Sequence, residues 1–198
     1  MEHGEKREAV MQATLELVGE HGFHGSPMAL IAERAGVAAG TIYRFFDSKD
    51  TLIKGIYASL EKQILAAVTL DYPAGHPVRV RFLHTGRQLV RFFIGSPLQF
   101  RFLEQYQNSP YGVASRRDKV FGRKDSNIIV ELFEEAAEQK IIKDLPLPIL
   151  FALTFGPLVD ICRDHILKFI TLDDGLIERT VEACWDAVRR GPDSGLRK

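Results

Sequence analysis

A stretch of thirty residues, Phe23 to Leu52, has a pattern that few folds can accommodate: FHGSPMALIAERAGVAAGTIYRFFDSKDTL. Apolar residues at helical spacing predict a helix after Ser26-Pro27, since serine suits the N-cap position and proline the first helical turn. Gly36 predicts the end of this helix, because glycine readily adopts the left-handed conformation in which many helices terminate. The helical pattern resumes from Gly40 to Phe46. The stretch therefore predicts two short helices joined by a tight turn.

The second of these helices is expected to have a buried side and an exposed side. Ile42, Phe45 and Phe46 form the predicted buried side. The exposed side then carries a hydroxyl, a phenol and a guanidinium, which can reach the phosphates and base edges of DNA. Ser48 is expected to cap the next helix. Lys49 in its first turn can add an ammonium group to the backbone N–H groups that bind a phosphate there.

The same residues resemble the DNA-binding domain of the TetR/AcrR family of one-component regulators. The resemblance covers about thirty contiguous residues with the family's internal spacing, which makes it more specific than a short motif. Ala38 departs from the family pattern, which usually has serine or threonine there, and a missing N-cap hydroxyl costs a helix ~1 kcal/mol. The predicted DNA-binding residues are Ser26, Ala39, Gly40, Thr41, Tyr43, Arg44 and Lys49.

The resemblance implies an all-α fold of about nine helices. An N-terminal three-helix helix-turn-helix domain would precede a larger helical domain that binds a ligand and dimerises. The segment Asp71–Pro77 holds two prolines and a glycine, so it breaks the helical pattern. We therefore expect a DNA-binding domain over 1–70, an effector-binding and dimerisation domain over 71–190, and a disordered tail over 191–198.

Apolar periodicity places the remaining helices along the chain. It predicts helices over 6–21, 49–70, 78–94, 98–107, 126–140, 148–170 and 173–190. The helix over 49–70 would be ~33 Å long and would link the two domains. The helix over 148–170 is apolar almost all round, so part of it is expected to meet a second subunit.

The last two predicted helices are candidates for a dimer interface. In the family that the chain resembles, two such helices from each subunit make a four-helix interface, and palindromic DNA half-sites also require a two-fold dimer. The alternative is that these helices form only the core of one chain. The predicted interface residues are Phe155, Leu158, Ile161, Val181, Trp185 and Val188.

The resemblance also implies that the middle helices enclose an effector pocket. This part of the chain is rich in aromatic residues, most of which are equally expected in a plain core. His84 and Tyr106 are the better pocket candidates because they are amphipathic. The predicted lining is His84, Phe102, Tyr106 and Phe133. Ten Lys/Arg against two Asp/Glu over 79–124 could favour an anionic effector, or could simply form solvated helix faces.

The formal net charge of zero does not suggest a non-specific nucleic-acid binder. Residues 1–62 even carry seven Lys/Arg against nine Asp/Glu. Specific DNA binding needs only a few correctly placed cations, so this balance is acceptable if Glu16, Glu20 and Glu33 face away from the DNA.

Other classes of protein are less well supported by the sequence. Cys162 and Cys184 lie far apart in apolar helical segments, and the histidines lack metal-site spacing, so we expect no metal, no cofactor and no enzymatic activity. No apolar run is long enough to span a bilayer, and the charged N-terminus does not resemble an export signal, so a cytoplasmic protein is expected. The sequence thus predicts a homodimeric regulator that binds a palindromic operator in double-stranded DNA and responds to a small-molecule effector, most simply as a repressor. The alternative is a ligand-binding or adaptor protein of the same fold without operator binding.

Overall fold

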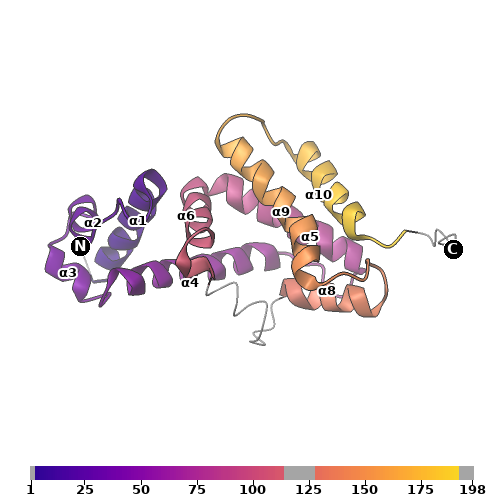
Figure 1. Cartoon of the computed structure of the whole chain (residues 1–198), viewed down its shortest axis with the longest axis horizontal. Coiled ribbons are helices and arrows are strands. Elements are labelled where there is room, and N and C mark those ends of the chain that lie inside the picture. The colour runs from indigo at the N-terminus through magenta and orange to yellow at the C-terminus, as the bar shows by residue number, and fades with distance from the viewer. Residues whose placement is uncertain (1–2, 114–127, 192–198) are drawn as a thin grey trace. The chain divides into compact units, whose positions relative to one another are not determined.

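The computed structural model describes residues 3–113 and 128–191. Within these ranges the chain forms nine helices whose bounds are both described, a further helical stretch at 110–113, and no strand apart from one isolated bridge between Ile142 and Arg189. The helices are grouped in two compact units (Figure 1). The described part of the first unit is 3–64 with 96–113, and that of the second is 65–95 with 128–191. The all-α fold predicted from the sequence is confirmed.

The first unit is built around a single hydrophobic core. Its helices are α1 (His3–His21), α2 (Met28–Arg34), α3 (Ala39–Tyr43), the first part of α4 (Lys49–Thr69), and α6 (Pro97–Gln107). Apolar residues at helical spacing on α1 and α4 are buried here, among them Val10, Leu17, Leu52 and Ile56. This burial is what favours these two helices, since short isolated helices are marginal in water.

Helix α6 belongs to this first unit, although it follows the α5 helix of the second unit in the chain. It lies against α1 (Figure 1). The rings of Tyr57 and Tyr106 stack with centroids 3.9 Å apart, and Phe23 meets Phe102 edge-on at 5.7 Å. Each such pair stabilises the packing by roughly 0.5–1.5 kcal/mol beyond the area that it buries. The domain boundary at residue 70 stays a prediction. The sequence did not predict that α6 packs on α1.

The second unit packs three helices around α5 (Val78–Gly95). These are α8 (Ile128–Glu138), α9 (Leu147–Ile166) and α10 (Asp174–Val188). Phe82 is at the centre of its core and contacts the rings of Phe133, Phe155 and Trp185. No helix in the described ranges is long and apolar enough to cross a membrane.

Helix α9 ends at Ile166, four residues before the end that the sequence predicts. Lys168 has a φ of 67°, its N–H donates to His165, and the N–H of Phe169 donates to Asp164. This is the Schellman pattern, in which a left-handed residue ends a helix. Lysine rarely adopts that conformation, so the sequence did not signal the end. The predicted start of the preceding helix at residue 126 and the predicted tail from 192 onward lie outside the described residues.

The arginines of α5 are paired with acidic residues from two other helices. Arg79, Arg87 and Arg91 contact Glu182, Glu178 and Asp174 of α10, at 2.9, 2.6 and 2.7 Å, and Arg81 contacts Glu135 of α8 at 2.5 Å. The exposed pairs of Arg79 and Arg91 stabilise the fold by only ~0–1 kcal/mol each, whereas the side chains of Arg81 and Arg87 are partly buried. The main consequence of these ion pairs is that the positive charges of the α5 arginines are paired with carboxylates, so α5 has no unpaired basic face.

Gly86 allows α5 to lie close to α9 and α10. A Cβ atom there would lie 2.6 Å from Val181 Cγ1 and 3.5 Å from Leu158 Cδ1. We therefore predict that Gly86→Ala lowers the free energy of unfolding by about 1–3 kcal/mol, the usual cost of overpacking a core. Gly95→Ala is the matched control, since a Cβ there meets nothing within 4 Å. Urea denaturation of both variants makes the comparison, and equal stabilities would contradict the close approach.

Candidate DNA-binding site

The turn between α2 and α3 is fixed by backbone hydrogen bonds. Gly36 has a φ of 65°, its N–H donates to Glu33, and the N–H of Val37 donates to Ala32. This Schellman pattern requires a left-handed residue, for which glycine pays no steric penalty. The predicted role of Gly36 as the end of the first short helix is confirmed.

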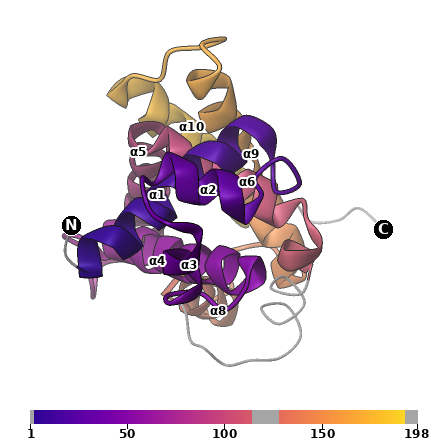
Figure 2. The same ribbon diagram turned by 90° about the vertical axis from the view of Figure 1, so that its left-hand side faces the viewer.

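Helix α3 is one of the short helices of the first unit (Figure 2), and it carries exposed residues on one side and buried residues on the other. Ile42 is completely buried and Phe46, just beyond the helix, is 5% exposed. Tyr43 is 54% exposed, and Arg44 is exposed beside it. The remaining predicted contacts on this helix are Ala39 and Gly40, which are exposed, and Thr41, which is half-buried. Exposed small residues at a helix start leave the backbone N–H groups accessible to a phosphate.

The start of α3 lacks a side-chain cap. Ala38 is its N-cap in an extended conformation, and no side chain accepts a hydrogen bond from the first turn. Four N–H groups at the start of any helix need partners from outside the helix. A DNA phosphate is one group that can satisfy them, and this is the end of the helix that Ala38 leaves open.

Ser26 does not have the capping role that the sequence suggests. The N-cap of α2 is Pro27, and no side chain caps that helix. Ser26 is fully buried, and its hydroxyl donates to the carbonyl of Gly22 at 2.8 Å. The capping prediction is therefore wrong, because the Ser26 side chain turns back into the loop before α2. Its contact with DNA stays a prediction, but the hydroxyl already has a partner in the protein.

The start of α4 is capped by side chains, as the sequence predicts. The hydroxyl of Ser48 accepts from the N–H of Thr51 at 3.1 Å, and the Thr51 hydroxyl accepts from the N–H of Ser48 at 2.9 Å. This reciprocal pair resembles a capping box with threonine in place of glutamate. It fixes the helix start that carries Lys49.

Lys49 donates its ammonium group to the carbonyl oxygen of Phe23, which precedes α2. Burial lowers the pKa of Lys49, and neighbouring Asp50 acts in the opposite direction. The Phe23 ring packs edge-on against Tyr111, with centroids 5.5 Å apart. A lysine bound to a backbone carbonyl leaves no signal in a sequence, so this contact could not have been predicted.

Tyr111 reaches the start of α4 from the segment after α6. Its hydroxyl donates to Asp50 Oδ1 at 2.5 Å. Burial and the Asp50 carboxylate raise the pKa of Tyr111 to about 12. The phenol therefore stays protonated and keeps this hydrogen bond throughout the neutral range.

Two of the acidic residues in this unit are matched by a cation. Arg34 on α2 contacts Glu16 at 3.4 Å and Glu20 at 3.2 Å, and it lowers the pKa of the Glu20 carboxyl. The guanidinium of Arg7 lies 5.2 Å from the centre of the Phe46 ring. The charges of Glu16 and Glu20 are thus partly screened by Arg34, although the excess of acids over 1–62 already includes this arginine.

Comparisons with known proteins address the identity of the chain. Residues 10–56 match the model for bacterial regulatory proteins of the tetR family, and residues 77–189 match the tetracyclin repressor-like C-terminal domain. The chain belongs to the TetR family of transcriptional regulators. It is therefore a DNA-binding transcriptional regulator, and the helix-turn-helix is its DNA-binding element.

Individual relatives of this TetR-family chain cover most of its length or only its DNA-binding part. An HTH-type transcriptional regulator of Haemophilus influenzae is 25% identical over 186 residues, covering 92% of this chain and 95% of the relative. A solved TetR-family structure from Vibrio parahaemolyticus is 30% identical with a TM-score of 0.75, covering 94% of this chain and 99% of that one. The transcriptional repressor KstR of Rhodococcus jostii is 45% identical over 49 residues, covering 25% of this chain and 23% of the relative.

The four residues predicted to line an effector pocket are divided between the two units, and their role stays a prediction. Phe102 and Tyr106 are buried in the core of the first unit, whereas His84 and Phe133 lie in the second. The sequence indicated His84 and Tyr106 through their amphipathic side chains, but it could not show that α6 packs with the DNA-binding helices. His84 and Phe133 are the two that stay candidates for a site in the second unit.

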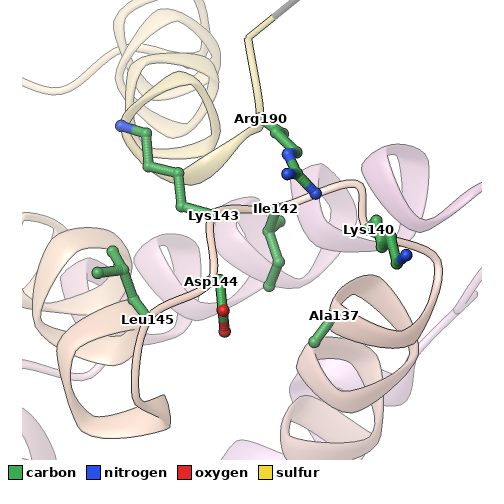
Figure 3. A pocket seen from close by; sticks show the side chains of 7 residues that line it. All are labelled: Ala137, Lys140, Ile142, Lys143, Asp144, Leu145 and Arg190. Carbon is green, nitrogen blue, oxygen red and sulfur yellow. The ribbon is translucent and has the colours of Figure 1, made fainter. Parts of the chain in front are cut away.

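A surface hollow of about 420 Å³ lies between the end of α8 and the residues after α10 (Figure 3). Its lining includes Lys140, Lys143 and Arg190, together with Asp144. The Lys143 ammonium donates to the carbonyl of Ala187 at 2.6 Å, so it already has a hydrogen-bond acceptor in the last turn of α10. None of the predicted effector residues lines this hollow.

The predicted dimer-interface residues lie mainly inside their own chain. Phe155, Leu158, Val181, Trp185 and Val188 are at most 8% exposed, and Ile161 is half-buried. Buried residues offer a partner little surface. The face of α9 that is open to a second chain instead holds Ile149, Ala152, Leu153, Gly156 and Pro157.

The link between Tyr111 and Asp50 leads to a prediction about alkaline stability. The pKa of Tyr111 is about 12 in the folded protein, above its ordinary value of 10.0, so ionisation of the phenol opposes folding. The stabilising contribution is complete below the ordinary pKa and is lost as the pH rises through the folded value. Tyr111→Phe should therefore flatten the loss of stability over this interval in urea denaturation. Tyr43→Phe is the control for loss of an exposed hydroxyl. If wild type and Tyr111→Phe lose stability identically with rising pH, ionisation of Tyr111 does not oppose folding.

Proposed function

We propose that the protein is a cytoplasmic, homodimeric repressor that binds a palindromic operator and releases it when a small molecule binds to the second unit. The observation that carries the proposal is α3 itself, which combines buried Ile42 with exposed Tyr43 and Arg44. A rigid helix with an exposed phenol, guanidinium and backbone can enter the major groove and contact phosphates. The KstR relative is a transcriptional repressor, which supports repression rather than activation.

The proposed contacts divide by chemistry. Arg44 can bind a phosphate or a guanine edge, Tyr43 can donate its hydroxyl to a phosphate, and Ala39 and Gly40 leave space for close backbone approach. Lys49 must exchange the Phe23 carbonyl for a phosphate if it is to contribute. Such an exchange would couple the loop before α2 to DNA binding.

A dimer is supported by the exposed apolar face of α9. Ile149 is 47% exposed and Leu153 is 38% exposed, one helical turn apart. Apolar side chains in a row on one helix face are typical of surfaces that another chain covers. Two-fold pairing through this face would give the two recognition helices that a palindrome requires.

An effector can act only through a difference in its affinity for two conformations. The chain leaves the first unit within α4 and returns to it at α6. A ligand that changes the packing of α5 in the second unit can therefore act through the two covalent connections that flank residues 65–95, and a third connection follows α6. These connections are the routes by which effector binding could lower operator affinity.

The DNA contacts are tested by replacing charged and uncharged members of the proposed surface. Arg44→Ala should weaken operator binding about tenfold and reduce the slope of log affinity against log salt by about one, as expected for a lost phosphate contact. Tyr43→Phe should weaken binding without changing the slope, because the phenol carries no charge. Lys62→Ala, on the exposed part of α4 ~20 Å along the helix from Lys49, is the control. Unchanged affinity in both Tyr43→Phe and Arg44→Ala would place the DNA surface elsewhere.

The dimer surface is tested by a charge on α9. Leu153→Glu should convert dimers to monomers in light scattering, because an unpaired charge buried in an interface is strongly unfavourable. Val80→Glu is the matched control, since Val80 on α5 is 37% exposed and Leu153 is 38% exposed. Trp185 is unsuitable for this test, because it is 4% exposed and a charge there would disturb folding. Dimers that persist in Leu153→Glu would move the interface to another face.

A further inference from the structure

Two buried nitrogen atoms on α5 have no hydrogen-bond partner within the described residues. They are Nε of Arg81 and Nε2 of His84. The two residues are three apart on one helix, so their side chains lie on the same face. The Arg81 side chain is 14% exposed, and His84 is half-buried with its Nε2 atom shielded.

Tyr72 brings a third polar group to the same place. Its ring meets the imidazole of His84 edge-on, with centroids 5.8 Å apart. Burial raises the pKa of Tyr72, and the neighbouring Arg81 guanidinium acts in the opposite direction. The Tyr72 side chain therefore lies beside both residues, and all three belong to the second unit.

Unpartnered buried nitrogens are rare in native proteins. The great majority of buried polar groups are hydrogen-bonded, and each exception costs roughly 1–3 kcal/mol. Nε of arginine can only donate, so its missing partner is an acceptor. Two such atoms from residues three apart on one helix are more informative than one, because both belong to the same helix face.

The charge of the missing partner follows from the ion pair that Arg81 already makes. Its guanidinium contacts Glu135 Oε1 through Nη2 at 2.5 Å and also interacts with the Tyr72 side chain, whereas Nε has no partner. The positive charge is thus matched already. A carboxylate ligand would bring a second anion close to Glu135, whereas an uncharged acceptor would satisfy Nε without adding charge.

We propose that Arg81, His84 and Tyr72 form a polar subsite for the uncharged oxygen of a small molecule, such as an amide, ketone or ester carbonyl or a hydroxyl. The proposal rests on the proposed effector-binding function of the second unit. It assigns that unit a preference for neutral over anionic ligands, which is the opposite of what the basic run of the sequence suggests.

The direct test observes the two nitrogens in the full-length, DNA-free protein. Side-chain ¹⁵N signals of Arg81 and His84 are followed during titration with two matched pairs of probes, hexanamide with hexanoate and benzamide with benzoate. Each pair has nearly the same shape and differs in charge. We expect at least one amide to shift both signals in a saturable manner and its carboxylate partner to shift neither at the same concentration.

Variants then connect the shifts to the subsite. Arg81→Lys keeps a positive charge for Glu135 but removes Nε, and His84→Phe keeps an aromatic ring against Tyr72 but removes Nε2. Each should weaken binding of the responding amide about five- to tenfold, the usual effect of one lost hydrogen bond. Arg91→Lys, on the exposed side of the same helix, is the control and should bind as the wild type does. Since the wild-type titration observes the Arg81 and His84 nitrogens directly, it tests binding at the subsite even if a variant fails to fold.

Three results would overturn the proposal. Shifts by neither amide would show that the two nitrogens hold water or nothing. Stronger binding of a carboxylate would reverse the inferred charge preference. Equal loss of binding in Arg91→Lys would show that the subsite residues have no special part.

Operator affinity with and without the responding amide is measured separately. An amide that binds at the subsite without changing operator affinity would retain the subsite and contradict the ligand-responsive part of the proposed function. If operator affinity responds to other molecules but the Arg81 and His84 signals respond to neither amide, the ligand-responsive function would be retained and the subsite would be contradicted.

Discussion

The DNA-binding surface depends on the burial of one side of a five-residue helix. A helix of that length cannot hold its own conformation in water, because nucleation costs more than a few backbone hydrogen bonds return. Helix α3 is held instead by completely buried Ile42, by Phe46 just beyond its end, and by the turn at Gly36. These buried contacts determine where the exposed Tyr43 and Arg44 lie. Recognition therefore depends on the core of the first unit more than on the helix itself.

The same core extends to a part of the chain that is distant in sequence. Helix α6 adds Phe102 and Tyr106 to it, and Tyr111 then bonds to Asp50 at the start of α4. Phe23 lies between this aromatic group and Lys49, to which it gives its carbonyl oxygen. Residues that follow the second unit's first helix thus help to position the DNA-binding end of α4. The stability of the DNA-binding element is consequently not a property of the N-terminal residues alone.

The sequence predicts the helices well because their apolar faces repeat at a clear period. The left-handed end at Gly36 and the cap at Ser48 follow from residue chemistry, and both are present. Periodicity shows that a residue faces inward but not which helix it meets, so Phe102 and Tyr106 could be placed in a pocket with His84. The same limit applies to Trp185 and Val188, which are buried against their own chain and not on its exposed face. The Ser26 side chain was misassigned because its local pattern fits a cap, whereas its hydroxyl bonds back to Gly22.

Charge patterns are a second case in which local sequence is a poor guide. The arginines of α5 suggest a basic surface when the sequence is considered alone, yet four of them pair with acids from α8 and α10. These acids come from the negatively charged last third of the chain, so the two segments are complementary. Within the described part of α5, two buried nitrogens stay without a partner while the four arginines are paired with acids. The proposed preference for an uncharged effector rests on that difference.

The central claim is that this chain binds a specific DNA sequence as a two-fold dimer through α3. The most direct measurement is selection of random duplex DNA on the purified protein, sequenced after several rounds, with Arg44→Ala selected in parallel. We predict an enriched palindrome for the wild type and a weaker, less specific enrichment for Arg44→Ala. An enriched sequence without two-fold symmetry would contradict the dimer, and equal enrichment by both proteins would contradict the role of α3. No enrichment at low salt by folded protein, with or without candidate effectors, would contradict operator binding itself.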